Sequence, residues 1–204
     1  MDNTNIRESN RETYKQKLSL HLDPNFNHKQ EILKCISLHE LCIYCKANNI
    51  SPQQFGPFIE SYLIHKCSMT KNNASKCIGD CKDKFNEDNE IKASLGGKEH
   101  NKFNYVQLRI NHKINNYIFT AYYLSPENLN QLGELFIFKI KKEDIPLLIV
   151  KYGGYAHGTE LKHGKITIED LNDVSNSKEY ALRPIYDSPL WKELLKFRVN
   201  ESDL

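Results

Sequence analysis

An acidic residue stands two positions before a lysine at three places in the sequence: Asp80 with Lys82, Glu90 with Lys92, and Glu160 with Lys162. Chance predicts roughly three such triplets in a chain of this composition, so the spacing alone carries no information. The context of Glu90 is more specific, because residues two apart on a strand share a face. A strand here would point Glu90, Lys92 and Ser94 one way and the intervening apolar residues toward the core. Only this triplet shows that alternation.

Asp80 is the nearest upstream acid that follows a glycine, and it ends an extended segment expected at 75–80. The polar run 81–89 predicts a nine-residue loop before a second strand at 90–95. That loop would place Asp80 across a hairpin from Glu90, where Cβ atoms lie about 5 Å apart and two carboxylates can bind one divalent cation. A tight turn at 86–89 would instead separate the two acids by roughly 16 Å. The hypothesis of a metal site therefore depends on the loop.

These residue types suit the hydrolysis of a phosphodiester. A divalent cation stabilises the charge on the phosphorane and lowers the pKa of the attacking water, and oxygen ligands favour Mg²⁺. A lysine beside the metal can orient or deprotonate the water and offset the charge of the phosphate. Gly96 and Gly97 would let a phosphate backbone approach closely.

Hydrophobic periodicity and cap residues predict the elements that hold these side chains. The first expected helix runs from a capping box at Asn27 to about residue 47, and the second is capped by Ser51, with Pro52 as its first residue and Gln54 as the capping partner. A third is expected at 145–152 between Asp144 and Gly153, and a last one begins at Ser188 and Pro189. The expected strands are the hairpin, 117–124 and 135–140, with a further extended segment at 179–184. This order predicts an α/β (α+β) fold, in which helices flank a central mixed sheet.

The composition sets the class of protein. With 204 residues, 39% hydrophobic, the chain suits a single domain at 21–204 that follows a polar N-terminal arm at 1–20. The polar start and the lack of a long apolar run argue against a signal peptide or a membrane span, so we expect a cytoplasmic protein. A net charge of +2 does not exclude a nucleic-acid partner, because acidic ligands in a cleft can cancel basic residues around it.

The six cysteines allow two interpretations. Cys42 with Cys45, and Cys77 with Cys81, could supply four thiolates to a zinc ion. Cys42 and Cys45 also fit the helical period as small core residues, however, and zinc knuckles usually lie in turns. We therefore expect no structural zinc and six unbridged thiols.

The residues that carry the chemistry resemble those of type II restriction endonucleases of the PD-(D/E)xK superfamily. The likeness covers about residues 50–150 and rests on Gly79-Asp80, on Glu90-Ile-Lys92-Ala-Ser-Leu-Gly-Gly97, on 103–109 and on the strand at 117–124. It implies a restriction-endonuclease-like core in which Asp80 and Glu90 hold Mg²⁺, Lys92 assists the water, and Glu60 on the preceding helix completes the metal shell. The chain departs from the pattern at Gly79, where the family has proline.

The resemblance implies a Mg²⁺-dependent endonuclease that cuts double-stranded DNA at a specific short site. A homodimer is expected, because a palindromic site presents the same face twice, and a cognate DNA methyltransferase would be the genetic partner. Two other functions stay open: a repair or nicking nuclease of the same fold, and a non-catalytic, zinc-stabilised DNA-binding module.

DNA contacts are expected from residues of two kinds. Arg109 and Arg183 are two of only five arginines, and arginine can read guanine with two hydrogen bonds. The glycine-rich loop that carries His157 and Thr159 is either a mobile loop or one that reaches into a DNA groove. Gln107, in the segment that shares the family likeness, is the fifth candidate for a DNA contact.

Overall fold

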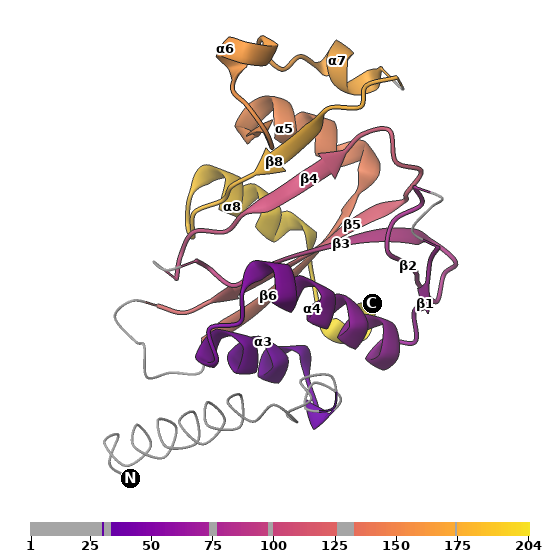
Figure 1. Cartoon of the computed structure of the whole chain (residues 1–204), viewed down its shortest axis with the longest axis vertical. Helices are drawn as coiled ribbons and strands as arrows, with labels where there is room; N and C mark the ends of the chain where they lie inside the picture. The colour runs from indigo at the N-terminus through magenta and orange to yellow at the C-terminus, as the bar shows by residue number, and fades with distance from the viewer. Residues whose placement is uncertain (1–29, 31–33, 74–76, 98–99, 126–132, 174) are drawn as a thin grey trace.

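The computed structural model of the chain describes residues 30, 34–73, 77–97, 100–125, 133–173 and 175–204. The arm predicted at 1–20 lies outside these residues. Helices flank a six-stranded mixed sheet, as predicted, and a second sheet of three strands lies beside it (Figure 1). The second sheet was not predicted.

The six-stranded sheet has a single parallel pair at its centre. Its strands, in spatial order, are β1 (Thr70–Lys71), β2 (Cys81–Lys82), β3 (Asp88–Ser94), β5 (Asn116–Tyr123), β6 (Glu134–Lys141) and β9 (Arg198–Val199). Strands β3 and β5 are parallel, and the other neighbours are antiparallel. A parallel pair needs a crossover, and here the crossover carries β4 (Tyr105–Arg109), which joins β8 (Glu179–Leu182) and β7 (Gly154–Tyr155) in the small sheet.

The helices divide into two groups. Before the hairpin come α3 (Leu38–Ala47) and α4 (Pro52–Lys66); after β6 come α5 (Ile145–Tyr152), α6 (Glu160–His163), α7 (Ile168–Asn172) and α8 (Pro189–Leu194). The short 3₁₀ turns are η3 (Lys142–Asp144), η4 (Leu195–Phe197) and η5 (Glu201–Asp203). Helices α3 and α4 lie on one side of the large sheet, whereas α5, α8 and the small sheet lie on the other (Figure 1).

The large sheet therefore separates two apolar layers, and β5 contributes to both. Its residues Ile118 and Tyr122 pack with α3 and α4, whereas Tyr117 and Phe119 pack toward the small sheet and α8. A strand buried on both faces reads as a continuous apolar run, which is why the sequence predicts it well. Trp191 of α8 closes the second layer, with its ring 4.9 Å from that of Phe136 and 5.5 Å from that of Phe138.

Two helix predictions need correction. The helix expected from Asn27 to residue 47 is not continuous, because the chain leaves the helical conformation at 35–37 and α3 starts anew with Ser37 as its N-cap. Helix α4 begins at Pro52 as predicted, but the Ser51 side chain caps no backbone N–H. It contacts the Gln54 side chain instead, at 3.4 Å, so the predicted capping box does not form.

The hairpin also differs from the prediction. The described residues of the segment expected as a strand at 75–80 form a bend, because Cys77 and Gly79 have φ angles of 53° and 78°. The nine-residue loop is wrong as well. Strand β2 pairs Cys81 with Asn89 and Lys82 with Asp88, so that only 83–87 remains as the turn.

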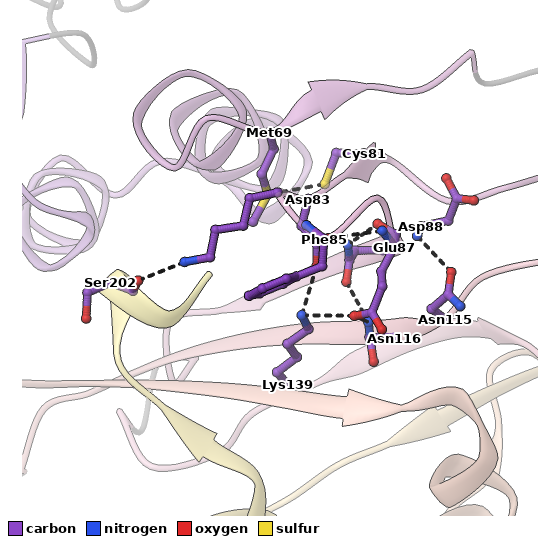
Figure 2. A network of polar contacts seen from close by, with 12 residues as sticks. Met69, Cys81, Asp83, Phe85, Glu87, Asp88, Asn115, Asn116, Lys139 and Ser202 are labelled. Atoms are coloured by element: carbon purple, nitrogen blue, oxygen red, sulfur yellow. Dashed lines mark hydrogen bonds and ion pairs between the residues drawn. The ribbon is translucent and has the colours of Figure 1, made fainter.

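A buried polar network fixes that turn (Figure 2). One oxygen of Asp83 accepts the backbone N–H groups of Phe85 and Glu87, at 2.9 and 3.0 Å, and the other accepts Lys139 Nζ of β6 at 2.8 Å. The Asp83 side chain is only 1% exposed. Asn116 of β5 donates to Glu87 at 2.9 Å, which ties the turn to the centre of the sheet. The network thus sets the register in which β2 meets β3.

Among the described helices, none combines the length and the apolar character needed to cross a membrane.

Candidate active site

Gly79 determines where the Asp80 backbone lies. Its φ of +78° belongs to the left-handed region, and a Cβ at this position would lie 2.5 Å from the Asn89 carbonyl oxygen. The close approach lets the Asp80 N–H donate to that carbonyl at 2.8 Å. Proline fixes φ near −65° and could not adopt this conformation. The departure from the family pattern at residue 79 therefore has a local structural reason.

Asp80 and Glu90 lie beside each other where the hairpin ladder ends. The last ladder pair is Cys81 with Asn89, and Asp80 and Glu90 are the next residue of each segment, close enough for the Glu90 charge to act on Asp80. Asp80 Oδ2 accepts the N–H of the next residue, Ile91, at 2.7 Å. Because the turn is centred midway between the two acids, a short turn brings them together as well as the predicted loop would have done. The premise about the loop was wrong, but the structure still places these acids as neighbours.

The pKa of Asp80 reflects its burial and the nearby charge of Glu90. Burial, then the Glu90 charge, raises the pKa of Asp80 to about 6, and the Glu60 charge adds to the effect. The hydrogen bond from Ile91 and the charge of Lys92 act in the opposite direction without cancelling the rise. Two carboxylates that resist joint ionisation are a pair that a cation would stabilise.

Lys92 neutralises Glu90 directly. Its Nζ lies 2.6 Å from Glu90 Oε1, and the two side chains are 18% and 9% exposed. The second oxygen of Glu90 lies 3.8 Å from Nδ1 of His112, in the crossover after β4. Burial lowers the pKa of His112, and the charges of Arg109, Lys92 and Lys142 lower it further against the pull of Glu90. Sequence reasoning missed His112, because no motif spacing links it to Glu90.

A cleft of about 1150 Å³ opens beside these residues, and Glu60, Asp80, Lys92 and Gln107 all line it. Its floor is the edge of β3 from Ile91 to Leu95. This edge is open because β2 pairs with β3 only at Asp88 and Asn89. Glu90 is not among the described residues that line the cleft, whereas Lys92, which pairs with it, does line the cleft.

Glu60 reaches the same cleft from α4, but its carboxylate pairs with Lys71 Nζ at 3.2 Å. Within the described residues, no three His, Cys, Asp or Glu side chains are grouped closely enough to hold a metal ion. The structure therefore brings Asp80, Glu90 and Lys92 together and leaves Glu60 at the wall of the cleft. Its role in a metal shell stays a prediction.

Gln107 is the one predicted DNA contact that lines the cleft. A β-bulge in β4 lies between Tyr105 and Leu108, and Gln107 within it has a φ of 58°. Bulges redirect side chains and are frequent beside active sites. The exposed Gln107 side chain faces the same space as Asp80 and Lys92.

The other four predicted contacts lie on or near the small sheet. Arg109 Nη2 pairs with Glu179 Oε1 at 2.6 Å, and His157 Nε2 lies 3.4 Å from Glu179 Oε2. Arg183 is exposed and donates to the Tyr155 carbonyl at 3.4 Å, while Thr159 is the N-cap of α6. Arg109 and His157 thus share an acidic partner that no sequence spacing indicates.

All six cysteines are unbridged. Cys42 and Cys45 are fully buried on α3, and burial raises the pKa of Cys45 to about 12. Cys81 is buried against Met69, with the two sulfur atoms 3.4 Å apart, whereas Cys77 is exposed. The two pairs do not form a thiolate site for zinc in the described part of the chain.

No protein-family model matches the chain, and comparisons with curated proteins and with solved structures give no significant match.

Proposed function

We propose that this protein is a Mg²⁺-dependent endonuclease that hydrolyses phosphodiester bonds of double-stranded DNA at a specific short site, as type II restriction enzymes do. The observation that carries the proposal is the juxtaposition of Asp80 and Glu90 at the end of the β2–β3 ladder, with Lys92 paired to Glu90 and lining a cleft together with Asp80. A restriction-endonuclease-like core, a homodimer and a cognate methyltransferase belong to the same proposal.

The donor set fits Mg²⁺. Hard oxygen ligands favour this ion, which usually takes only one or two protein carboxylates and keeps several waters. Asp80 and Glu90 would supply those two carboxylates, and the raised pKa of Asp80 reflects burial first and the Glu90 charge second, both of which a divalent charge would offset. When bound, Mg²⁺ stabilises charge on the phosphoryl group and makes the attacking water more acidic.

Each side chain of the site has a distinct role. Asp80 is held by the Ile91 N–H through Oδ2, and no donor in the described residues reaches Oδ1, which leaves that oxygen for a ligand. Lys92 sits at the cleft surface with its ammonium on Glu90, from where it can turn toward a phosphate or hold the attacking water. His112 backs the second oxygen of Glu90 and limits the rotation of the carboxylate.

The test is a cleavage assay on long unmethylated DNA with Mg²⁺, using the full chain and its Glu90→Gln variant. Discrete fragments from the wild type alone support a restriction enzyme. Nicks or structure-dependent cuts support a repair or nicking nuclease. DNA retardation without cleavage, together with one tightly held zinc per chain after chelator washing, would overturn the proposal in favour of a binding module.

A further inference from the structure

We propose that the end of the cleft remote from Asp80 binds a second phosphate of the DNA strand, through Lys46, His100 and Lys102. This inference rests on the proposed function, and it names the part of the substrate that the cleft holds beyond the reacting phosphate. It also gives the strand a path along the open edge of β3.

Lys46 is the best-placed cation of this end. Its Nζ donates to the carbonyl oxygens of Leu95 and Gly97, at 2.6 Å each, which anchors the end of α3 to the turn after β3. An ammonium group has three N–H donors, and no further acceptor in the described residues contacts this one. One donor of Lys46 therefore remains for a ligand, and the residue lines the cleft.

His100 and Lys102 stand beside it. Both line the cleft, and burial first and the Lys46 charge second lower the pKa of His100, so its ring would serve as a hydrogen-bonding group and not as a cation. Nδ1 of His100 is buried with no hydrogen-bond partner in the described part of the chain. A Cβ at Gly97 would lie 3.5 Å from the Lys102 carbonyl oxygen, so the chain folds back here and brings Lys102 next to the contacts of Lys46.

The cleft is electrically polarised. Glu60 and Asp80 are the acids among its described lining residues, and both lie at the end nearest the hairpin. Lys46, His100 and Lys102 lie at the other end. The lining also includes the apolar residues Phe55, Val106 and Leu124, which suit the sugar and base portions of a nucleotide. A strand with a metal-bridged phosphate at one end and a second phosphate at the other matches this pattern.

The separation of the two ends fits a polynucleotide. Asp80 is anchored to the N–H of Ile91 and Lys46 to the carbonyl of Leu95, so the anchors are about 13 Å apart along an extended strand. Each nucleotide of duplex DNA rises about 3.4 Å along the axis. Because phosphates of one strand lie farther apart than this axial rise, the second phosphate would lie beyond the nucleotide next to the one that is cut, too far for a mononucleotide to reach.

The experiment measures binding of a short labelled DNA duplex at several salt concentrations, with Ca²⁺ in place of Mg²⁺ to prevent cleavage. We compare the wild type with Lys102→Gln and Lys46→Gln, and use Lys196→Gln as the matched control. Lys196 is a 67% exposed lysine of η4 that pairs with Glu193 outside the cleft. Thermal unfolding of each variant is recorded, because Lys46 also anchors the turn.

Each lost phosphate contact should reduce the slope of log Kd against log salt by about 0.9. Lys102→Gln and Lys46→Gln should each show this change, and Lys196→Gln should not. If the wild type binds and cuts DNA but both cleft variants keep its salt slope, this inference is overturned and the proposed function is not. A wild type that neither binds nor cuts DNA would remove the proposed function, and this inference with it.

Discussion

Asp80 and Glu90 lie beside each other where the β2–β3 ladder ends at the cleft, and Lys92, which lines the cleft, pairs with Glu90. Their coupling is visible in the raised pKa of Asp80, to which burial contributes most and Glu90 next. Asp80 is fixed by the backbone of β3, whereas Glu90 is fixed by Lys92 and His112. The two acids therefore depend on different neighbours, and substitutions can separate their roles.

The three acid-x-lysine triplets provide matched controls for the active site. Glu90→Gln and Lys92→Ala should each reduce DNA cleavage by several orders of magnitude, because a metal ligand and the group that serves the water act as a unit. Glu160→Ala and Lys162→Ala alter the same spacing on the exposed helix α6 and should leave cleavage nearly unchanged. Initial rates on plasmid DNA measure the contrast.

In the Asp80–Lys82 triplet, the acid and the lysine can be tested separately. Asp80→Ala should abolish cleavage through the metal, while Lys82→Ala removes only a half-buried ion pair with Asp88 and should change cleavage little. All variants should retain DNA binding in Ca²⁺, which shows that the fold survives. If Glu90→Gln cleaves DNA while Glu160→Ala does not, the active site has been assigned to the wrong element.

Gly79 should be sensitive to any side chain. Gly79→Ala introduces a Cβ 2.5 Å from the Asn89 carbonyl at a φ of +78°, whereas Gly164→Ala has a φ of +81° with no atom within 4 Å. Gly164→Ala should lower the free energy of unfolding by about 1 kcal/mol from φ alone. Gly79→Ala should lower it further and reduce cleavage, because Asp80 moves with the backbone. Urea unfolding of both variants measures the difference, and equal losses would contradict the packing argument.

Local sequence patterns predicted the elements that local forces determine. The bounds of α5 agree with the prediction because Pro146 lies in its first turn and Gly153 ends it, and β5 and β6 follow from apolar runs. Strand β4 was missed, since the bulge at Gln107 breaks the alternation that marks a strand. The hairpin turn was misjudged because Lys139, a residue 56 positions from Asp83, fixes it.

The same limit holds for the candidate site: contacts between residues close in the sequence could be predicted, and contacts between distant segments could not. Residue type and alternation identified Glu90 and Lys92, which are two positions apart. His112 and the shared contact of Arg109 and His157 with Glu179 arise where distant segments meet, so no spacing in the sequence encodes them.

The ion pair of Asp83 and Lys139 should make stability depend on pH. Burial alone would raise the pKa of Asp83, but the hydrogen bonds from Lys139 and the backbone lower it below its usual 3.8. A carboxyl group whose pKa is lower in the folded state than in the unfolded state stabilises the fold at pH values above its unfolded-state pKa. That contribution is lost as the pH falls through its folded-state pKa. Asp83→Asn should therefore cost about 3 kcal/mol at pH 7 and progressively less below about pH 4.

Urea unfolding of the wild type and Asp83→Asn across this pH range measures the effect. Lys82→Ala, which removes an ion pair of the same hairpin that is more exposed than that of Asp83 and Lys139, is the control and should change stability less at any pH. A difference between the wild type and Asp83→Asn that stays constant from neutral to acidic pH would show that the carboxylate charge is not the source of the stabilisation.

A palindromic site requires two active centres for a cut of both strands in one encounter, so we expect a homodimer in solution or on DNA. Light scattering of the free protein and of its complex with duplex DNA in Ca²⁺ measures the mass. A monomer under both conditions would favour a nicking enzyme over a restriction enzyme.

Divalent metal should stabilise the folded protein through Asp80. Without metal, Asp80→Asn should be more stable than the wild type at neutral pH, because a pKa raised to about 6 means that the ionised carboxylate destabilises the fold as the pH rises through this value. Mg²⁺ at 100 times its Kd should add about 2.7 kcal/mol to the wild type and little to Asp80→Asn. Thermal unfolding with and without Mg²⁺ measures both effects, with Glu160→Gln on α6 as the control that should respond like the wild type. Equal stabilisation of the wild type and Asp80→Asn by Mg²⁺ would show that the ion binds elsewhere.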